Sequence, residues 1–317
     1  MSQAANTVIA ATGDFVLPFD IAKAGVRGRL VRLDLASARA LSAHALPEPA
    51  ARIVGEALAL SALLGTALKL DGRLTVQTKA HGPLDLVAAD YYGEDPDHED
   101  GAKERGVRGH ARLDQARFDA LQNPDFTQLL GQGSMAITIE PRRGGNTYQG
   151  IVALSPEGIA ASAEIYFTQS EQLPTVIRLA AAPLYLAGDK QPHWRAAGIM
   201  LQMTPESAKP GAAPEDMQTS DDWQRLSLIL KTVEDLELLD VSLAPETVLW
   251  RLFHEDEVMV QPALPIAFRC DCAPERIAQV LKSYAPDERA TLADPDGMIR
   301  ARCEFCGATH EIAPASL

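Results

Sequence analysis

All four cysteines of this 317-residue chain lie in its final fifth, where they form two close pairs. The first pair is Cys270-Asp271-Cys272, and the second, thirty residues further on, is Cys303-Glu304-Phe305-Cys306. Four sulfurs that meet in space match the ligand number of a tetrahedral Zn²⁺ site. The same sulfurs can also leave a metal as two short-range disulfides. The pattern therefore predicts a C-terminal unit built around a metal site that oxidation could open.

The spacing within each pair suits a shared metal ion. Two residues between Cys303 and Cys306 let both sulfurs face one ion, and Gly307 frees the backbone for a turn, as in a zinc knuckle. Cys270 and Cys272 would share one face of an extended strand, because side chains alternate along it. We predict one Zn²⁺ per chain, bound by Cys270, Cys272, Cys303 and Cys306; the alternative is four unrelated buried thiols. Spacing does not decide between a permanently closed zinc site and one that oxidation releases.

Three other residues lie near the cysteines in sequence. His310 follows Cys306 by four residues and is a possible substitute ligand, although a solvent-facing or hairpin histidine is the commoner case. Arg269 and Arg302 each adjoin a cysteine, and would either offset the dianionic charge of Zn(Cys)₄ or lie in solvent. Thiolate is the form that binds zinc and also the form that peroxide attacks, so a site that holds zinc is also oxidisable.

Charge and hydropathy limit the possible partners. A formal charge of −14 and a pI near 4.9 disfavour nucleic acid, whose phosphates are bound by lysine and arginine. The first thirteen residues hold no basic residue, unlike a signal peptide, and the apolar stretch 57–68 is shorter than the roughly 20 residues of a membrane span. We therefore expect a soluble cytoplasmic protein with no nucleic-acid or membrane partner. In a reducing cytosol such cysteines indicate metal or redox chemistry.

Residues 1–205 are predicted to form an α+β core domain. Apolar side chains surround nearly the whole circumference of a helix at 49–70, so protein should enclose it. Alternating patterns predict strands at 74–78, 135–140 and 148–154, and successive strands joined by tight turns favour antiparallel sheet. The acidic stretch 94–104 is expected to be an exposed loop.

Residues 206–257 are predicted to be an acidic helical linker. They contain thirteen acidic and four basic residues, a net charge of −9. Apolar residues recur at helical spacing from Trp223 to Leu236, and Pro245 suits the first turn of a second helix. Repulsion among like charges would make these helices marginal, while docking onto the core would keep them folded.

Residues 258–317 are predicted to be a small zinc-binding domain. A unit of this size forms little core unaided and commonly uses a metal as a staple. Pro274–Leu281 predicts one short helix, and Asp296-Gly297 predicts a hairpin turn before an alternating strand that reaches Cys303.

No motif indicates catalysis. The seven histidines show no HExxH or triad-like spacing, and the serines lack a nucleophile elbow. A thiol-disulfide oxidoreductase that uses Cys303 and Cys306 is disfavoured, because a thioredoxin-like βαβ context is missing. We predict a protein without enzymatic activity.

Several further stretches are distinctive. They are Leu68-Lys69-Leu70-Asp71-Gly72, Tyr148 to Val152, Tyr166-Phe167 with Ser170 to Pro174, Ala196 to Gly198 with Met200 to Gln202, and Trp250 to Val258. With the CxC and CxxC pairs, they resemble the 33 kDa heat shock protein family of redox-regulated bacterial chaperones. The resemblance covers nearly the whole chain. Two departures are an apparent insertion at 95–103 and a tail of only eleven residues after Cys306.

The resemblance implies a holdase that is quiescent when reduced and zinc-bound. Oxidation would then pair Cys270 with Cys272 and Cys303 with Cys306, release zinc, unfold the linker and produce an active homodimer that binds unfolded client proteins. Loss of zinc would melt the small domain and remove a neighbour of the acidic helices. We expect the client surface at 223–239 and on the core area that this segment covers. The competing hypothesis is a constitutive zinc-stabilised protein-binding module without redox switching.

Overall fold

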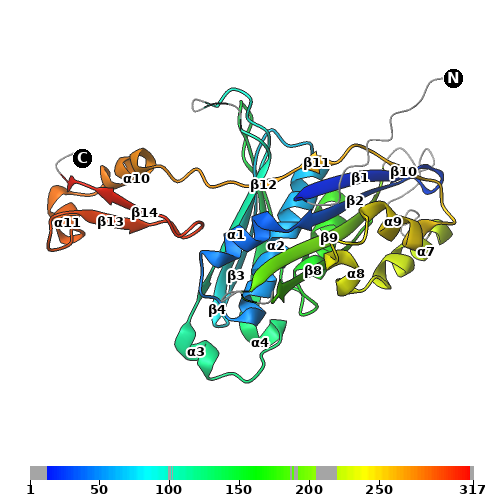
Figure 1. Cartoon of the computed structure of the whole chain (residues 1–317), viewed down its shortest axis with the longest axis horizontal. Helices are drawn as coiled ribbons and strands as arrows, with labels where there is room; N and C mark the ends of the chain where they lie inside the picture. The colour runs from blue at the N-terminus through cyan, green and yellow to red at the C-terminus, as the bar shows by residue number, and fades with distance from the viewer. Residues whose placement is uncertain are drawn as a thin grey trace.

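The computed structural model describes residues 13–98, 101, 103–185, 188, 192–204 and 220–314. Two six-stranded sheets with a long helix between them form the body of the molecule, and a small hairpin unit stands at the C-terminal end (Figure 1). This confirms the predicted α+β class with mainly antiparallel sheets. The predicted opening of the linker, at 209–214, lies outside the described residues.

The first sheet has the strand order β10-β1-β2-β9-β8, with β11 also paired to β1. Its strands are β1 (Phe15–Ile21), β2 (Val26–Leu33), β8 (Thr175–Leu184), β9 (His193–Met203), β10 (Val258–Val260) and β11 (Leu264–Pro265). All pairings in it are antiparallel. Both faces are apolar: Val16 and Met200 point inward, whereas Leu17, Phe19 and Leu201 belong to a second core on the outer face. The sheet therefore needs a cover on each side.

The second sheet has the order β12-β5-β4-β3-β6-β7. Its strands are β3 (Gly72–Ala80), β4 (Leu84–Tyr92), β5 (Gly106–Leu113), β6 (Gly133–Pro141), β7 (Tyr148–Ala153) and β12 (Ala267–Phe268). β3, β6 and β7 confirm the three strands predicted from alternation. β12 pairs with β5 in parallel, and the other pairings are antiparallel.

The long helix α2 (Glu48–Ala67) fills the space between the sheets and confirms the predicted enclosed helix. It is long and apolar enough to cross a membrane, but 83% of that window is buried inside the protein, as in a core helix. Shorter elements complete the body. They are η1 (Ala22–Ala24), α1 (Leu35–Ser42), α3 (Gln115–Asp119), α4 (Phe126–Leu130), α5 (Ile159–Tyr166) and the π-helical turn η2 (Phe167–Glu171).

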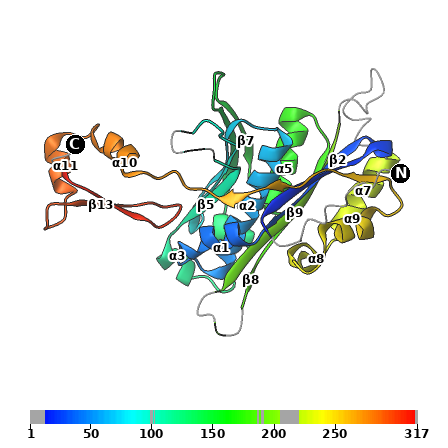
Figure 2. The same ribbon diagram turned by 45° about the horizontal axis from the view of Figure 1, so that its top comes forward.

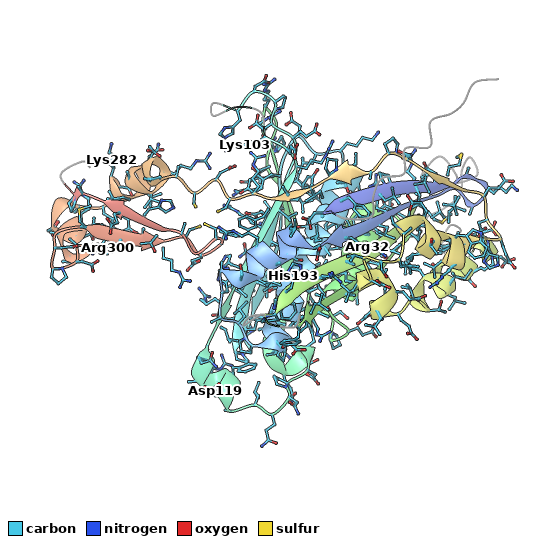
Figure 3. All side chains as sticks on the ribbon, viewed as in Figure 1. Arg32, Lys103, Asp119, His193, Lys282 and Arg300 are labelled. Atoms are coloured by element: carbon cyan, nitrogen blue, oxygen red, sulfur yellow. The ribbon has the colours of Figure 1, made fainter. Side chains whose placement is uncertain are left out.

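Three helices cover the outer face of the first sheet: α7 (Asp221–Lys231), α8 (Asp235–Leu239) and α9 (Pro245–Phe253). The helix predicted from 223 to 236 is thus two helices, separated by a turn at Thr232 and Val233. Their buried side chains join the outer core cluster with β1, β8 and β9. Arg32 of β2 lies beneath them and donates to the carbonyl oxygens of Leu238, Leu243 and Glu237 (Figure 3). The acidic helices are therefore docked on the core, as expected.

The C-terminal unit contains α10 (Pro274–Leu281), α11 (Pro286–Thr291) and the hairpin β13 (Ile299–Arg302) and β14 (Thr309–Ile312). α10 has the predicted bounds, and α11 was not predicted. The unit stands at the opposite end of the molecule from α7–α9 in both views (Figures 1 and 2). The expectation that it neighbours the acidic helices is therefore wrong, because the two sheets lie between them.

The chain from α9 to the first cysteine runs along the core. β10 and β11 pair with β1, and β12 pairs with β5. Residues 258–268, grouped with the zinc domain from sequence, thus add edge strands to both large sheets. Strands of two or three residues are too short to show an alternating pattern in the sequence. They form only because they pair with longer strands that are distant in the chain.

Candidate metal centre

The two cysteine pairs come from different local structures. Cys270 and Cys272 follow β12 in irregular chain, outside the strand that their spacing predicted. Cys303 and Cys306 occupy the turn between β13 and β14. There the Gly307 amide donates to the Cys303 carbonyl oxygen (2.9 Å), and Gly307 has a φ of +71°. This left-handed conformation favours glycine and confirms its predicted role in the turn.

All four sulfurs meet at one point. The Sγ atoms of Cys270, Cys272, Cys303 and Cys306 lie within 4.8 Å of one another, and all four are free thiols. Two separations join one pair to the other: 3.7 Å from Cys270 Sγ to Cys303 Sγ and 3.3 Å from Cys272 Sγ to Cys306 Sγ. Among the described residues this is the group of histidine, cysteine and acidic side chains that could hold a metal ion.

The donor set fits zinc. Tetrahedral Zn–S bonds of about 2.3 Å place sulfurs roughly 3.8 Å apart, close to the spacing observed. Burial raises the pKa of Cys270, and burial together with the neighbouring thiols raises the pKa of Cys272. Burial also acts on Cys303, but hydrogen bonds from the Cys306 and Phe305 amides outweigh it and lower that pKa. A bound cation would offset the raised pKa values of Cys270 and Cys272 and favour the thiolate form that metal binding requires.

The hydrophobic core around this centre is small. Leu281, Ile299 and Ile312 are its buried residues, with Ile277, Ala278 and Ala293 packed against them. Few buried apolar contacts imply low local stability. A metal bound at the cysteines would add the cross-link that this core lacks.

The charge next to the sulfurs comes from a residue that the sequence did not indicate. Arg108 of β5 places Nη1 3.8 Å from Cys270 Sγ. Arg269 instead pairs with Asp271, and Arg302 donates to the carbonyl oxygen of Ala43, at 3.0 Å. Neither Arg269 nor Arg302 has a described contact with a sulfur. The arginine that contacts a sulfur is Arg108, which belongs to the core domain.

His310 lies at the edge of the cluster. It is half-buried on β14, and its Nε2 is 3.4 Å from Cys272 Sγ. The histidine is therefore a hairpin residue, as expected, that lies outside the four-ligand group and contacts one of its thiols.

The residues between the cysteines contact the core. Asp271 accepts from Lys103 (2.7 Å) and Arg269 (3.1 Å), which outweigh burial and lower the pKa of its carboxyl group. The Phe305 ring packs against Arg108 and, edge-on, against His110. The contacts with Lys103, Arg108 and His110 were not predicted, because these partners lie far away in the chain.

Comparisons with known proteins agree with one another. The family model described as Hsp33 protein matches residues 14–313. A 33 kDa chaperonin of Caulobacter vibrioides is 35% identical over 305 residues, covering 95% of each chain, and one of Shewanella loihica is 36% identical over 287 residues, covering 90% of this chain and 88% of the relative. The crystal structure of a 33 kDa chaperonin (heat shock protein 33 homolog) from Thermotoga maritima has a TM-score of 0.74, with 20% identity and 96% coverage of both chains.

Proposed function

The chain belongs to the Hsp33 protein family, and on that basis we propose that it is a chaperone whose binding of unfolded proteins is switched on by oxidation. In the reduced form the metal centre is closed and the acidic helices cover the first sheet. Oxidation opens the centre and releases the linker, and the exposed surface then prevents clients from aggregating. The observation that carries this proposal is the apolar outer face of the first sheet beneath α7–α9.

That outer face has the properties of a client surface. Leu17, Phe19 and Ile21 of β1 and Ile199 and Leu201 of β9 are all buried there. Release of α7–α9 would expose this face together with the apolar sides of the helices. Contiguous apolar surface binds unfolded chains, while a net charge of −14 keeps a complex in solution.

The thiols supply the redox chemistry. Two thiolates lose two electrons to one molecule of hydrogen peroxide, which takes up two protons and becomes two waters, while one S–S bond forms. We propose disulfides Cys270–Cys272 and Cys303–Cys306, since these partners stay close in sequence when the unit unfolds, whereas the pairs across the centre depend on the fold. Bound zinc would contribute roughly 10–16 kcal/mol of apparent binding free energy, as in zinc-finger peptides. Oxidation of the four cysteines removes every ligand of the ion.

The C-terminal unit does not lie next to α7–α9. Oxidation can therefore affect the linker only by changing the structure of residues 258–269, which connect the two. The Arg269 amide donates a hydrogen bond to the Val107 carbonyl oxygen, just after β12. Unfolding of the chain at Cys270 therefore removes the structure that holds this end of β12 in place. β12 and β11 have only two residues each, and fraying from Cys270 towards α9 breaks few hydrogen bonds. Charge repulsion in the linker then favours release, and heat adds to it.

The proposal divides the chain into three functional parts. The core extends to about residue 205, the labile linker covers 206–257, and the zinc domain follows. Because 258–268 pair with the large sheets, we propose that the zinc domain begins near Arg269 rather than at 258. We further propose that the oxidised form is a cytoplasmic homodimer without a nucleic-acid or membrane partner, since exposed apolar faces self-associate and the acidic charge repels polyanions.

The test is light scattering from a thermally unfolding client protein. We expect no suppression by the zinc-loaded reduced protein, near-complete suppression after peroxide treatment at elevated temperature, and loss of suppression when reductant is restored. Equal client binding before and after oxidation would instead support a constitutive zinc module, and absence of binding in both states would exclude a chaperone. Insulin reduction with turnover would identify an oxidoreductase.

A further inference from the structure

The acidic stretch at 94–104, expected to be an exposed loop, contacts the metal centre. Asp95 and Lys103 pair through both backbone hydrogen bonds (2.8 and 2.7 Å), which closes the loop. Lys103 then reaches Asp271, the residue between the first two cysteines. The loop is also the part of the chain that resembles an insertion relative to the family.

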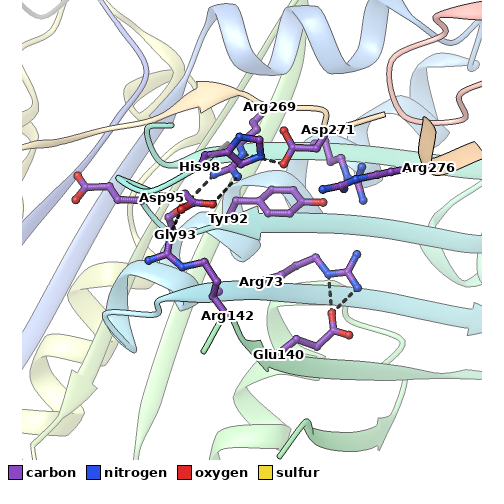
Figure 4. Close-up of a pocket in the computed structure, with 13 residues that line it drawn as sticks. Arg73, Tyr92, Gly93, Asp95, His98, Glu140, Arg142, Arg269, Asp271 and Arg276 are labelled. Carbon is purple, nitrogen blue, oxygen red and sulfur yellow. Dashed lines mark hydrogen bonds and ion pairs between the residues drawn. The ribbon is translucent and has the colours of Figure 1, made fainter. Parts of the chain in front are cut away.

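The contact with Asp271 is sheltered from solvent. The Asp271 side chain is 8% exposed and that of Lys103 is 26% exposed. Arg269 binds the second carboxylate oxygen of Asp271, and its Nη2 lies 4.0 Å from Asp95 (Figure 4). Sheltered, hydrogen-bonded ion pairs are screened less than exposed ones. This network therefore fixes the backbone between Cys270 and Cys272.

The network continues into the second sheet. Arg142, at the end of β6, pairs with both Asp95 and Asp71. Arg269 also donates to the Gly93 carbonyl oxygen (3.2 Å) and stacks on the Tyr92 ring. The first cysteine pair is thus fastened to rigid strands rather than to a freely moving loop.

The second cysteine pair is fastened by Arg108. Its guanidinium carbon lies 3.9 Å from the centre of the Phe305 ring, and Nε donates to Asp90 at 2.8 Å. The same side chain contacts Cys270 Sγ, so one arginine of β5 touches both halves of the centre. A desolvated cation–π contact of this kind is a specific attachment.

We infer that Lys103, Arg108 and Arg269, which we call the bracket, are positioning residues that set how readily oxidant opens the metal centre. The bracket holds the C-terminal unit against the core through Asp271 and Phe305, so the half-buried sulfurs react mainly when the unit moves away. Weakening it raises the population of the undocked state and hence the oxidation rate. This inference rests on the proposed oxidation of these cysteines, and it makes the core domain part of the sensor.

The test uses the zinc-loaded, reduced full chain with hydrogen peroxide, a chelating dye that reports zinc release and a thiol label that reports oxidation. Lys103→Met and Asp271→Asn are each expected to release zinc about tenfold faster, the change in rate produced by 1.4 kcal/mol. The double variant should release zinc no faster than Asp271→Asn, because that substitution already removes the ion pair with Lys103. Lys103→Arg should restore the slow rate. Asp97→Asn, which breaks the exposed pair with Arg143 in the same loop, is the matched control and should leave the rate unchanged.

Two results would overturn the inference. One is a Lys103→Met rate equal to or below that of Asp97→Asn, since loss of a nearby cation would itself disfavour thiolates. The other is unchanged hydrogen exchange at amides 303–307 in the reduced, zinc-loaded Lys103→Met protein, which should exchange faster if undocking increases. Neither measurement involves a client. If Lys103→Met releases zinc faster but the oxidised protein does not prevent client aggregation, the proposed function alone is refuted. If the oxidised protein prevents client aggregation but Lys103→Met and Asp97→Asn release zinc at the same rate, the bracket alone is refuted.

Discussion

Removing Zn²⁺ from the reduced protein with a chelator is expected to unfold residues 274–314 and leave both six-stranded sheets folded. The C-terminal unit has three buried apolar side chains, so metal binding worth roughly 10–16 kcal/mol would dominate its stability. Hydrogen exchange measures this directly: amides of β13 and β14 should lose protection, while those of β2 and β9 keep it. Restoring zinc should restore protection.

A variant pair separates the metal effect from a general loss of stability. Cys303→Ser removes one ligand and should reproduce the chelator result in the reduced protein. Ser283→Ala changes an exposed residue after α10 and should retain zinc and protection. If β13 and β14 stay protected after complete zinc removal, the metal does not hold this unit together and the proposed switch fails.

Leu226→Ala is expected to activate the protein without oxidation. Leu226 is fully buried where α7 packs on the first sheet, and truncation of a buried leucine costs about 2–5 kcal/mol. A marginal acidic linker would lose a large share of its docking energy, so the reduced, zinc-loaded variant should suppress client aggregation. Limited proteolysis should cut 220–257 faster than in the parent protein.

Leu228 provides the control on the same helix, because its side chain is 66% exposed. Leu228→Ala makes the same chemical change and should alter the free energy of unfolding by no more than about 0.5 kcal/mol. It should stay inactive until oxidised. If limited proteolysis shows that the linker is released in Leu226→Ala, but the variant binds no client, then the outer face of the first sheet is not the client surface.

The elements recognised from sequence are those whose pattern is local. α2 is apolar on all sides, β3 and β6 contain the alternating stretches 74–78 and 135–140, and α10 begins at a proline with apolar residues on one face. The turn at Thr232 was missed because apolar spacing continues through it into α8. β10, β11 and β12 were missed because strands of two or three residues exist only through their distant partners.

The same distinction applies to the candidate site. The four sulfur ligands were predicted because the two cysteines of each pair lie within four residues of one another, so their spacing can be recognised in the sequence. The contacts of Arg108 with Cys270 and Phe305, and of Lys103 with Asp271, depend on how the C-terminal unit docks on β5, which no local pattern encodes. Arg269 and Arg302 were plausible partners by proximity in sequence, but a side chain beside a cysteine in the chain need not point towards its sulfur.

Both ends of the linker are attached to the first sheet, at Met203 of β9 and at Val258 of β10. While β10 stays paired, a released linker is consequently a closed loop and not a free tail. Ring closure limits the conformational entropy that the segment gains on release, and it keeps the helices at high effective concentration over the face they left. Re-covering that face after reduction is therefore an intramolecular step, which would displace a bound polypeptide by direct competition.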